Sequence, residues 1–162
     1  LFKRTILQGV LNPITESPVS AVNATSVAES RGITIKEAES EESEGYETLI
    51  EVKAITEKGV SSVEGTFLHE VTITKINGYK VDVKPEGYMF IAKYKDIPGS
   101  IGAIGTIFGQ EKINIGIMQV GRDITGGEAI MVLTLDTEAT PDVTNKVKEL
   151  DQVKDATGIN LL

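Results

Sequence analysis

Residues 88–161 alternate between strand and helix patterns in one order, and this order most strongly constrains the fold. We expect strands at 88–95, 113–121, 128–136 and 153–161. Helices are expected at 98–111 and from Pro141 onward, because proline suits the first turn of a helix and Thr140 can cap the second one. The order β-α-β-β-α-β predicts a four-stranded antiparallel sheet with two helices on one face. The other face would need a partner to cover it.

Alternation along two of these strands predicts which side chains are buried. In strand 113–121, Ile113, Ile115 and Ile117 are expected to face one side of the sheet. In strand 128–136 one face carries only apolar residues, namely Ala129, Met131, Leu133 and Leu135. We expect both sets to lie against the core.

The first half of the chain mixes helical and strand patterns. Helices are expected from Phe2 until Asn12-Pro13, and at about 22–30 with Gly32 beyond the end. The expected strands are 33–38, 48–55, 60–68, 71–76 and 79–83, with Asn77-Gly78 as a tight hairpin turn. A seam at residues 84–87 then predicts two small domains of an α+β protein, residues 1–84 and 85–162.

Composition excludes several classes of function. The chain has 162 residues and a formal net charge of −8, which disfavours a nucleic-acid partner. It has no run of 18 apolar residues, so no membrane segment is expected. With no cysteine and a single histidine, His69, we expect no metal site and no catalytic residues. The glutamate-rich stretch 37–47 is expected to be a solvated loop.

Two short polar side chains mark a candidate site. Asp96 ends the strand 88–95 and leads through Pro98-Gly99 into the helix, and Asn114 opens the next strand. We expect Asp96 and Asn114 to converge on a small ligand.

The intervening helix carries a stripe of three glycines, Gly102, Gly105 and Gly109. An interior glycine costs roughly 1 kcal/mol relative to alanine, so something should approach this backbone closely. Close packing and ligand access both remain open. Because the spacing is not Gly-x-Gly-x-x-Gly, a dinucleotide site is not expected, and the chain should not bind NAD.

Several short blocks resemble known families. Residues 87–162, with Asp96-x-Pro98-Gly99 and Ile113-Asn114-Ile115, resemble an ACT domain, a small-molecule sensing module of ferredoxin-like fold. The whole chain resembles the C-terminal regulatory region of the D-3-phosphoglycerate dehydrogenase family, in which an intervening domain precedes the ACT domain. The supporting blocks in the first half are 9–13, 22–24, 31–33, 65–66, 76–82 and 86–87.

This resemblance implies a function for the whole chain. It would be a regulatory fragment with an N-terminally incomplete intervening domain, taken from a cytoplasmic NAD-dependent enzyme whose cofactor and catalytic sites lie outside it. L-serine would bind between paired ACT domains of a homodimer or tetramer and inhibit the enzyme. The alternatives are the regulatory part of an L-serine dehydratase and an oligomerisation module that binds no ligand.

The resemblance also implies site residues. A serine site would use Asp96 for the ammonium group and Asn114 of the neighbouring subunit for the carboxylate, since these groups have the required acceptor and donor chemistry. The full set implied is Tyr94, Asp96, Ile97, Pro98, Gly99, Ser100 and Asn114. Some relatives bind an anion in the intervening domain, where this chain has Lys75, Lys80 and Lys84. These three lysines could equally be solvated.

Overall fold

The computed structural model describes residues 2–39, 46, 48–67, 69–123 and 126–162, and the chain divides into two compact units. The first unit spans residues 1–42 and the second 43–162. The division at 84/85 expected from the sequence falls inside the second unit and stays a prediction. Each unit is described by itself.

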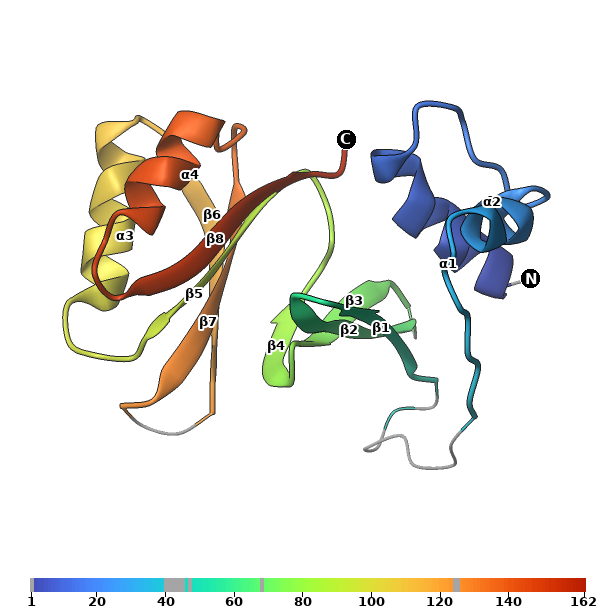
Figure 1. Ribbon diagram of the computed structural model, residues 1–162. Helices are drawn as coiled ribbons and strands as arrows, with labels where there is room; N and C mark the ends of the chain where they lie inside the picture. The colour runs from blue at the N-terminus through green and yellow to red at the C-terminus, as the bar shows by residue number, and fades with distance from the viewer. Residues whose placement is uncertain (1, 40–45, 47, 68, 124–125) are drawn as a thin grey trace. The chain divides into compact units, whose positions relative to one another are not determined.

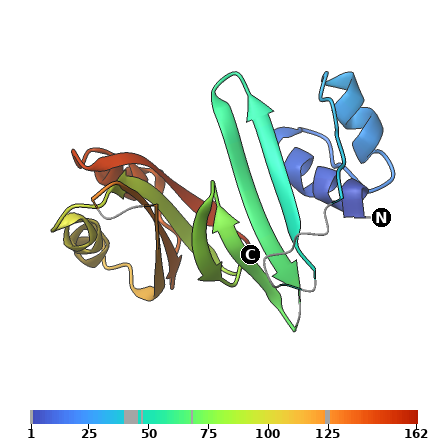
Figure 2. The same ribbon diagram turned by 90° about the horizontal axis from the view of Figure 1, so that it is seen from below.

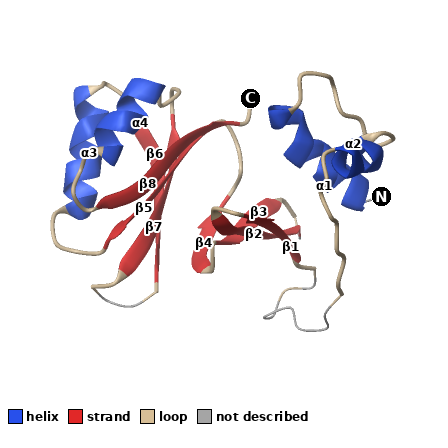
Figure 3. Cartoon of the chain, viewed as in Figure 1, coloured by secondary structure: helices blue, strands red, loops and turns tan. Residues whose placement is uncertain are grey.

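The first unit is helical in its described part (Figure 3). It contains α1 (Phe2–Leu11), the short 3-10 helix η1 (Asn12–Ile14) and α2 (Ala24–Ser30). Its small core consists of Leu7, Leu11, Val19, Ala24 and Ala28. Gly32 adopts φ +72° just beyond α2, as expected from its position, and the Ile33 N–H donates to the Ala28 carbonyl at 3.0 Å.

The expected strand at 33–38 is wrong. These residues belong to no helix or strand, because no neighbouring strand pairs with their backbone in the described part of the chain. Ile35 packs against the helical core instead, which explains why the segment contains apolar residues. Most of the glutamate-rich stretch that follows lies outside the described residues.

The second unit begins with a four-stranded antiparallel sheet in the order β1-β2-β3-β4. Its strands are β1 (Ile50–Thr56), β2 (Gly59–Phe67), β3 (Val71–Ile76) and β4 (Tyr79–Val83). Figure 2 shows β1 and β2 as one long hairpin. Asn77 (φ 50°) and Gly78 (φ 83°) form the tight turn expected between β3 and β4.

The second sheet has the order β6-β7-β5-β8, with antiparallel neighbours throughout. Its strands are β5 (Tyr88–Lys95), β6 (Ile115–Arg122), β7 (Glu128–Leu135) and β8 (Val153–Asn160). The helices α3 (Ser100–Gln110) and α4 (Pro141–Lys148) cover the same face of this sheet (Figure 1). The expected β-α-β-β-α-β fold is therefore confirmed.

The core of this domain lies between the sheet and its two helices. The four alternating residues of β7, from Ala129 to Leu135, are all buried there, as expected. Phe90 of β5 and Phe108 of α3 meet edge to face with ring centroids 5.0 Å apart. Ile117 does not join them and is 54% exposed, because a bulge between Ile115 and Ile117 breaks the alternation.

The other face of the β5–β8 sheet is not left uncovered. Ile76 and Val83, from β3 and the end of β4, form one buried cluster with Met89, Ile130 and Val132 of that face. At Gly121 an added Cβ would lie only 2.5 Å from the Lys80 carbonyl oxygen, so glycine permits this close approach. The chain itself supplies the cover that the sequence assigned to a partner.

Candidate functional site

The loop from β5 to α3 is held by backbone and side-chain hydrogen bonds. The Asp96 N–H donates to the Gly127 carbonyl at 2.9 Å, and the buried Ser100 hydroxyl donates to the Lys95 carbonyl at 2.9 Å. Gly99 is the N-cap of α3 with φ +93°, a conformation that L side chains rarely adopt. Because glycine has no side chain, no side-chain cap satisfies the first N–H groups of α3. The Ser100 N–H donates to the Ile97 carbonyl at 3.2 Å, so the backbone donors that this helix start can offer are the N–H groups that follow Ser100.

Tyr94 lies at the end of β5 with its side chain fully buried. Its hydroxyl has no hydrogen-bond partner among the described residues. Burial raises the pKa of this phenol, the nearby Asp96 carboxylate raises it further, and Arg122 acts in the opposite direction. A buried hydroxyl without a partner is costly, so this group is suited to a ligand or a water molecule.

Asp96 forms an ion pair that sequence reasoning missed. The Nε atom of Arg122 lies 3.0 Å from Asp96 Oδ2, and the two side chains are 54% and 10% exposed. Tyr94 and Arg122 are both opposite Ala129, on either side of β7, so one row of the sheet brings them together. The signal was the strand–turn–strand pattern of residues 113–136, which places the end of β6 beside the start of β7.

Asn114 does not join this group within one chain. It precedes β6 at the end opposite Arg122, because Ile115 pairs with Leu135 while Arg122 pairs with Ala129. The exposed Asn114 amide donates to Asp136 Oδ2 at 2.8 Å. The expected convergence of Asp96 and Asn114 is therefore wrong for a single copy, because a strand-helix-strand unit places them at opposite ends of parallel strands.

The three candidate anion-binding lysines are only partly gathered. Lys75 and Lys80 are opposite each other on β3 and β4 and line a hollow of about 220 Å³. Glu64 lines the same hollow, lies 3.3 Å from the Lys75 ammonium and accepts a hydrogen bond from Thr74 at 2.9 Å. This carboxylate opposes anion binding, so an anion site at Lys75 and Lys80 stays a prediction.

Lys84, the third candidate, does not line that hollow. It pairs with Glu86 at 2.9 Å and with Glu70 at 3.4 Å. Hydrogen bonds to Glu86 and then to Glu70 raise its pKa. Two carboxylates already balance this ammonium group.

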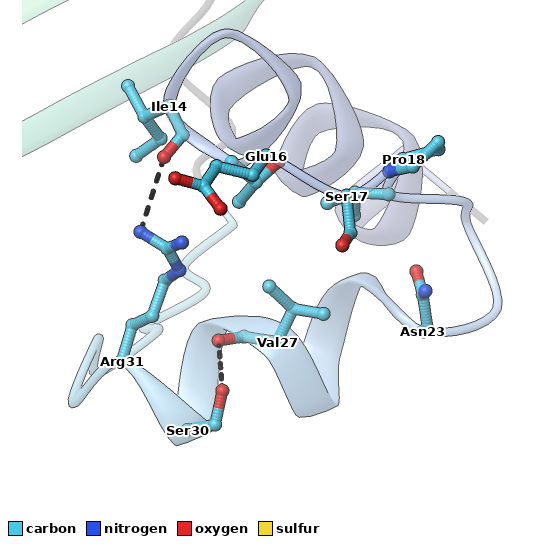
Figure 4. A pocket seen from close by; sticks show the side chains of 10 residues that line it. Ile14, Glu16, Ser17, Pro18, Asn23, Val27, Ser30 and Arg31 are labelled. Carbon is cyan, nitrogen blue, oxygen red and sulfur yellow. Dashed lines mark hydrogen bonds between the residues drawn. The ribbon is translucent and has the colours of Figure 1, made fainter.

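A larger groove of about 450 Å³ lies in the first unit, between residues 14–19 and α2 (Figure 4). The Arg31 guanidinium donates to the Ile14 carbonyl at 3.3 Å, and the Ser30 hydroxyl donates to the Val27 carbonyl at 2.9 Å. The first contact ties the segment to the end of α2, and the second lies within α2, so neither points to a ligand.

The described residues contain neither a metal site nor a membrane-spanning helix. No group of three potential ligand side chains could hold a metal ion. No helix in the described ranges combines the length and the apolar character that crossing a bilayer requires.

Two family models match the chain. Residues 1–77 match the D-3-phosphoglycerate dehydrogenase intervening domain, and residues 88–152 match the ACT domain. Together with the fold, these matches define a regulatory region that carries an ACT domain.

The chain is also similar to D-3-phosphoglycerate dehydrogenases. It is 38% identical to that of Methanocaldococcus jannaschii over 162 residues (99% of this chain and 31% of that protein). It is 40% identical to that of Archaeoglobus fulgidus (98% and 31%) and 37% identical to that of Bacillus subtilis (98% and 30%). The chain thus spans about a third of the length of these relatives, and it corresponds to the C-terminal regulatory part of the D-3-phosphoglycerate dehydrogenase family.

Proposed function

We propose that this chain is the regulatory region of an NAD-dependent D-3-phosphoglycerate dehydrogenase, and that its ACT domain binds L-serine as a feedback inhibitor. NAD and the catalytic residues belong to the rest of the enzyme. The observation that carries the serine site is the grouping at the end of β5. There a fully buried hydroxyl with no partner among the described residues and a nearly buried carboxylate come just before a helix that has no side-chain cap.

The chemistry of this grouping fits a zwitterionic amino acid. Asp96 can accept hydrogen bonds from the ligand ammonium group. The N–H groups at the start of α3 can donate to the ligand carboxylate, since a helix start favours negative charge. The Tyr94 hydroxyl would gain a partner when serine binds. These groups leave the outer side of the ligand to be held by a second copy.

A second copy can supply Asn114 through the edge strand β6. If two β6 strands pair antiparallel about a two-fold axis at Met118, Asn114 lies opposite the partner's Arg122 and therefore near the partner's Asp96. Such a pairing would extend the sheet across the dimer. It would also complete two equivalent ligand sites.

The two edges of the sheet differ in a way that favours this pairing. Residues 115–121 of β6 carry no charge, and Ile117 and Met118 are exposed. The other edge, β8, carries Lys154 and Asp155. Charged side chains on an edge strand oppose pairing with another strand. We therefore assign the dimer contact to β6.

A site built across an interface gives a route for inhibition. Serine would bind the paired state more tightly than the separated state and would shift the population toward pairing. The same pairing restrains whatever the two regulatory regions are attached to. Feedback inhibition then needs no direct contact between serine and the active site.

Isothermal calorimetry tests this proposal. L-serine should bind the full chain, and Asp96→Ala and Asn114→Ala should each lower its affinity about tenfold to a hundredfold, because each removes charge-assisted hydrogen bonds. Asp151→Ala and Asn145→Ala are matched controls, since both residues are exposed and lie on or just after α4. The controls should bind serine like the unaltered chain.

The outcomes separate the candidate functions. Heat with another amino acid but not with serine would keep the sensor and reject the serine assignment. No heat with any amino acid would favour the ligand-free oligomerisation module. An upstream sequence without a nucleotide-binding domain would favour the serine dehydratase alternative.

A further inference from the structure

The ion pair between Asp96 and Arg122 has a consequence for ligand selection. The Asp96 carboxylate is only 10% exposed, and a carboxylate removed from water needs a positive partner. Arg122 supplies that partner through its Nε atom at 3.0 Å. The donors on the two terminal nitrogens of a guanidinium remain available for a further acceptor. The site therefore presents a negative group and a positive group side by side before any ligand arrives.

Charge balance limits what such a pair can accept. A ligand with only an ammonium group would place two cations against the single Asp96 carboxylate, and Arg122 would repel it. A ligand with only a carboxylate would meet Arg122 but would be repelled by Asp96. A zwitterion matches both partners, with its ammonium group on Asp96 and its carboxylate on Arg122. Each charged group of the site and of the ligand then lies next to groups of opposite charge.

The surroundings support this role for Arg122. Its side chain is 54% exposed, so its outer edge is accessible to a ligand. The Tyr94 hydroxyl, which has no partner in the described part of the chain, lies near both charged groups, because Asp96 raises its pKa and Arg122 lowers it. The helix start beside Asp96 adds neutral donors for a carboxylate but no full charge.

We propose that Arg122 is a specificity-determining residue that binds the carboxylate of the amino acid and excludes amines that lack one. This inference rests on the proposed amino-acid site and assigns it a selection rule. Arg122 therefore has two contacts in the bound state. Its Nε keeps Asp96 neutralised, and its terminal nitrogens hold the ligand carboxylate.

Calorimetry with three ligands tests the rule on the full chain. The ligands are L-serine, ethanolamine, which is serine without its carboxylate, and 3-hydroxypropanoate, which is serine without its ammonium group. The unaltered chain should bind serine at least tenfold more tightly than either analogue, as expected for one charge-assisted hydrogen bond. Arg122→Gln should lower serine affinity about tenfold and leave ethanolamine affinity equal or higher, so the selectivity between them collapses.

Two further variants test whether the effect is specific to the Arg122 guanidinium. Arg122→Lys keeps the charge but loses the planar fork, and it should retain part of the preference for serine over ethanolamine. Lys148→Gln is the matched control, because Lys148 is half exposed like Arg122 and pairs with an exposed carboxylate, Asp155, at 3.4 Å; it should leave all three affinities unchanged. Thermal unfolding without ligand shows whether each variant is folded.

The results distinguish failure of this inference from failure of the proposed function. If the unaltered chain binds no serine, the serine assignment of the proposed function fails, and if it binds no other amino acid either, the amino-acid site itself is rejected. If serine binds and folded Arg122→Gln loses affinity for serine and ethanolamine by the same factor, or for neither, Arg122 does not set the selectivity. A folded Arg122→Lys variant that binds serine no better than ethanolamine would also overturn the inference.

Discussion

Tyr94 shows how a single side chain can be unfavourable for stability and still suit a site. Its ring belongs to the core of the second sheet and its helices, but its buried hydroxyl has no hydrogen-bond partner among the described residues. Leaving such a group unsatisfied costs free energy that an apolar ring would not lose. A position that is suboptimal in the free protein is typical of a ligand site.

We expect Tyr94→Phe to raise the free energy of unfolding of the ligand-free chain by about 1 kcal/mol, because it removes an unsatisfied hydroxyl. Urea denaturation measures this difference. In saturating serine the gain should shrink or reverse, since the hydroxyl then has a partner. A variant that is less stable than the unaltered chain without ligand would show that the hydroxyl is already satisfied.

The difference in the free energy of unfolding between Tyr94→Phe and the unaltered chain should depend on pH. Burial, followed by the Asp96 carboxylate, raises the Tyr94 pKa in the folded state above the ordinary value near 10. As pH rises through about 10, the unfolded chain loses this proton before the folded chain does, so the free energy of unfolding falls until the folded pKa is passed. The advantage of Tyr94→Phe should therefore grow between pH 8 and pH 10.5. The other tyrosines cancel in the difference, and an unchanged advantage would contradict the assignment.

Among the elements, α3 is unusual because three glycines, which weaken an isolated helix, lie within it. Apart from the adjacent residues and the helix's own backbone, no atom of the described chain lies within 4 Å of a Cβ placed on Gly102, Gly105 or Gly109. The close packing that could explain the glycine stripe is therefore not provided by the residues that the structure describes. Gly99 differs from these three, because its φ of +93° itself requires glycine.

The two kinds of glycine predict opposite effects of alanine. Gly105→Ala should raise the free energy of unfolding by about 0.5–1 kcal/mol, since alanine loses less backbone freedom on folding. Gly99→Ala should lower it by about 1–2 kcal/mol, because alanine in the left-handed region clashes with its own backbone. Urea denaturation of dilute protein gives both values. Destabilisation by Gly105→Ala would mean that a second copy covers the stripe.

On the scale of the whole molecule, the cover over one face of the β5–β8 sheet limits which surface could form a dimer contact. The sheet face cannot be the dimer contact, because Ile76 and Val83 are packed against it. The outer edge of β6 remains, and it carries no charged residue from 115 to 121. A dimer would therefore form edge to edge rather than face to face.

Light scattering should show at least a dimer at tens of micromolar, and Met118→Lys should make the chain monomeric. The variant places two like charges next to the two-fold axis, which opposes pairing. Thr157→Lys on the edge strand β8 is the matched control and should remain dimeric. Serine affinity should fall together with dimerisation in Met118→Lys. A monomeric unaltered chain would reject this interface.

The sequence by itself determined the elements whose causes are local. Thr140 accepts the Val143 N–H at the start of α4, Asn77-Gly78 turns β3 into β4, and the alternation of β7 buries the residues expected. Each of these depends on residues within a few positions of one another, so a pattern in the chain is sufficient to predict it. The closeness of Asp96 to the start of α3 was predictable for the same reason, whereas Tyr94 was implied by the resemblance to the family.

Only the tertiary structure decided how distant residues meet. Arg122 reaches Asp96 because β5 and β6 flank β7, with Tyr94 and Arg122 both opposite Ala129. Ile117 is exposed because a bulge shifts the register of β6. Residues 33–38 remain unpaired, since a strand needs a neighbour that its own sequence does not specify. Asn114 is bonded to Asp136, 22 residues further along the chain. Pairing and register depend on contacts between segments far apart in sequence, and local patterns do not encode them.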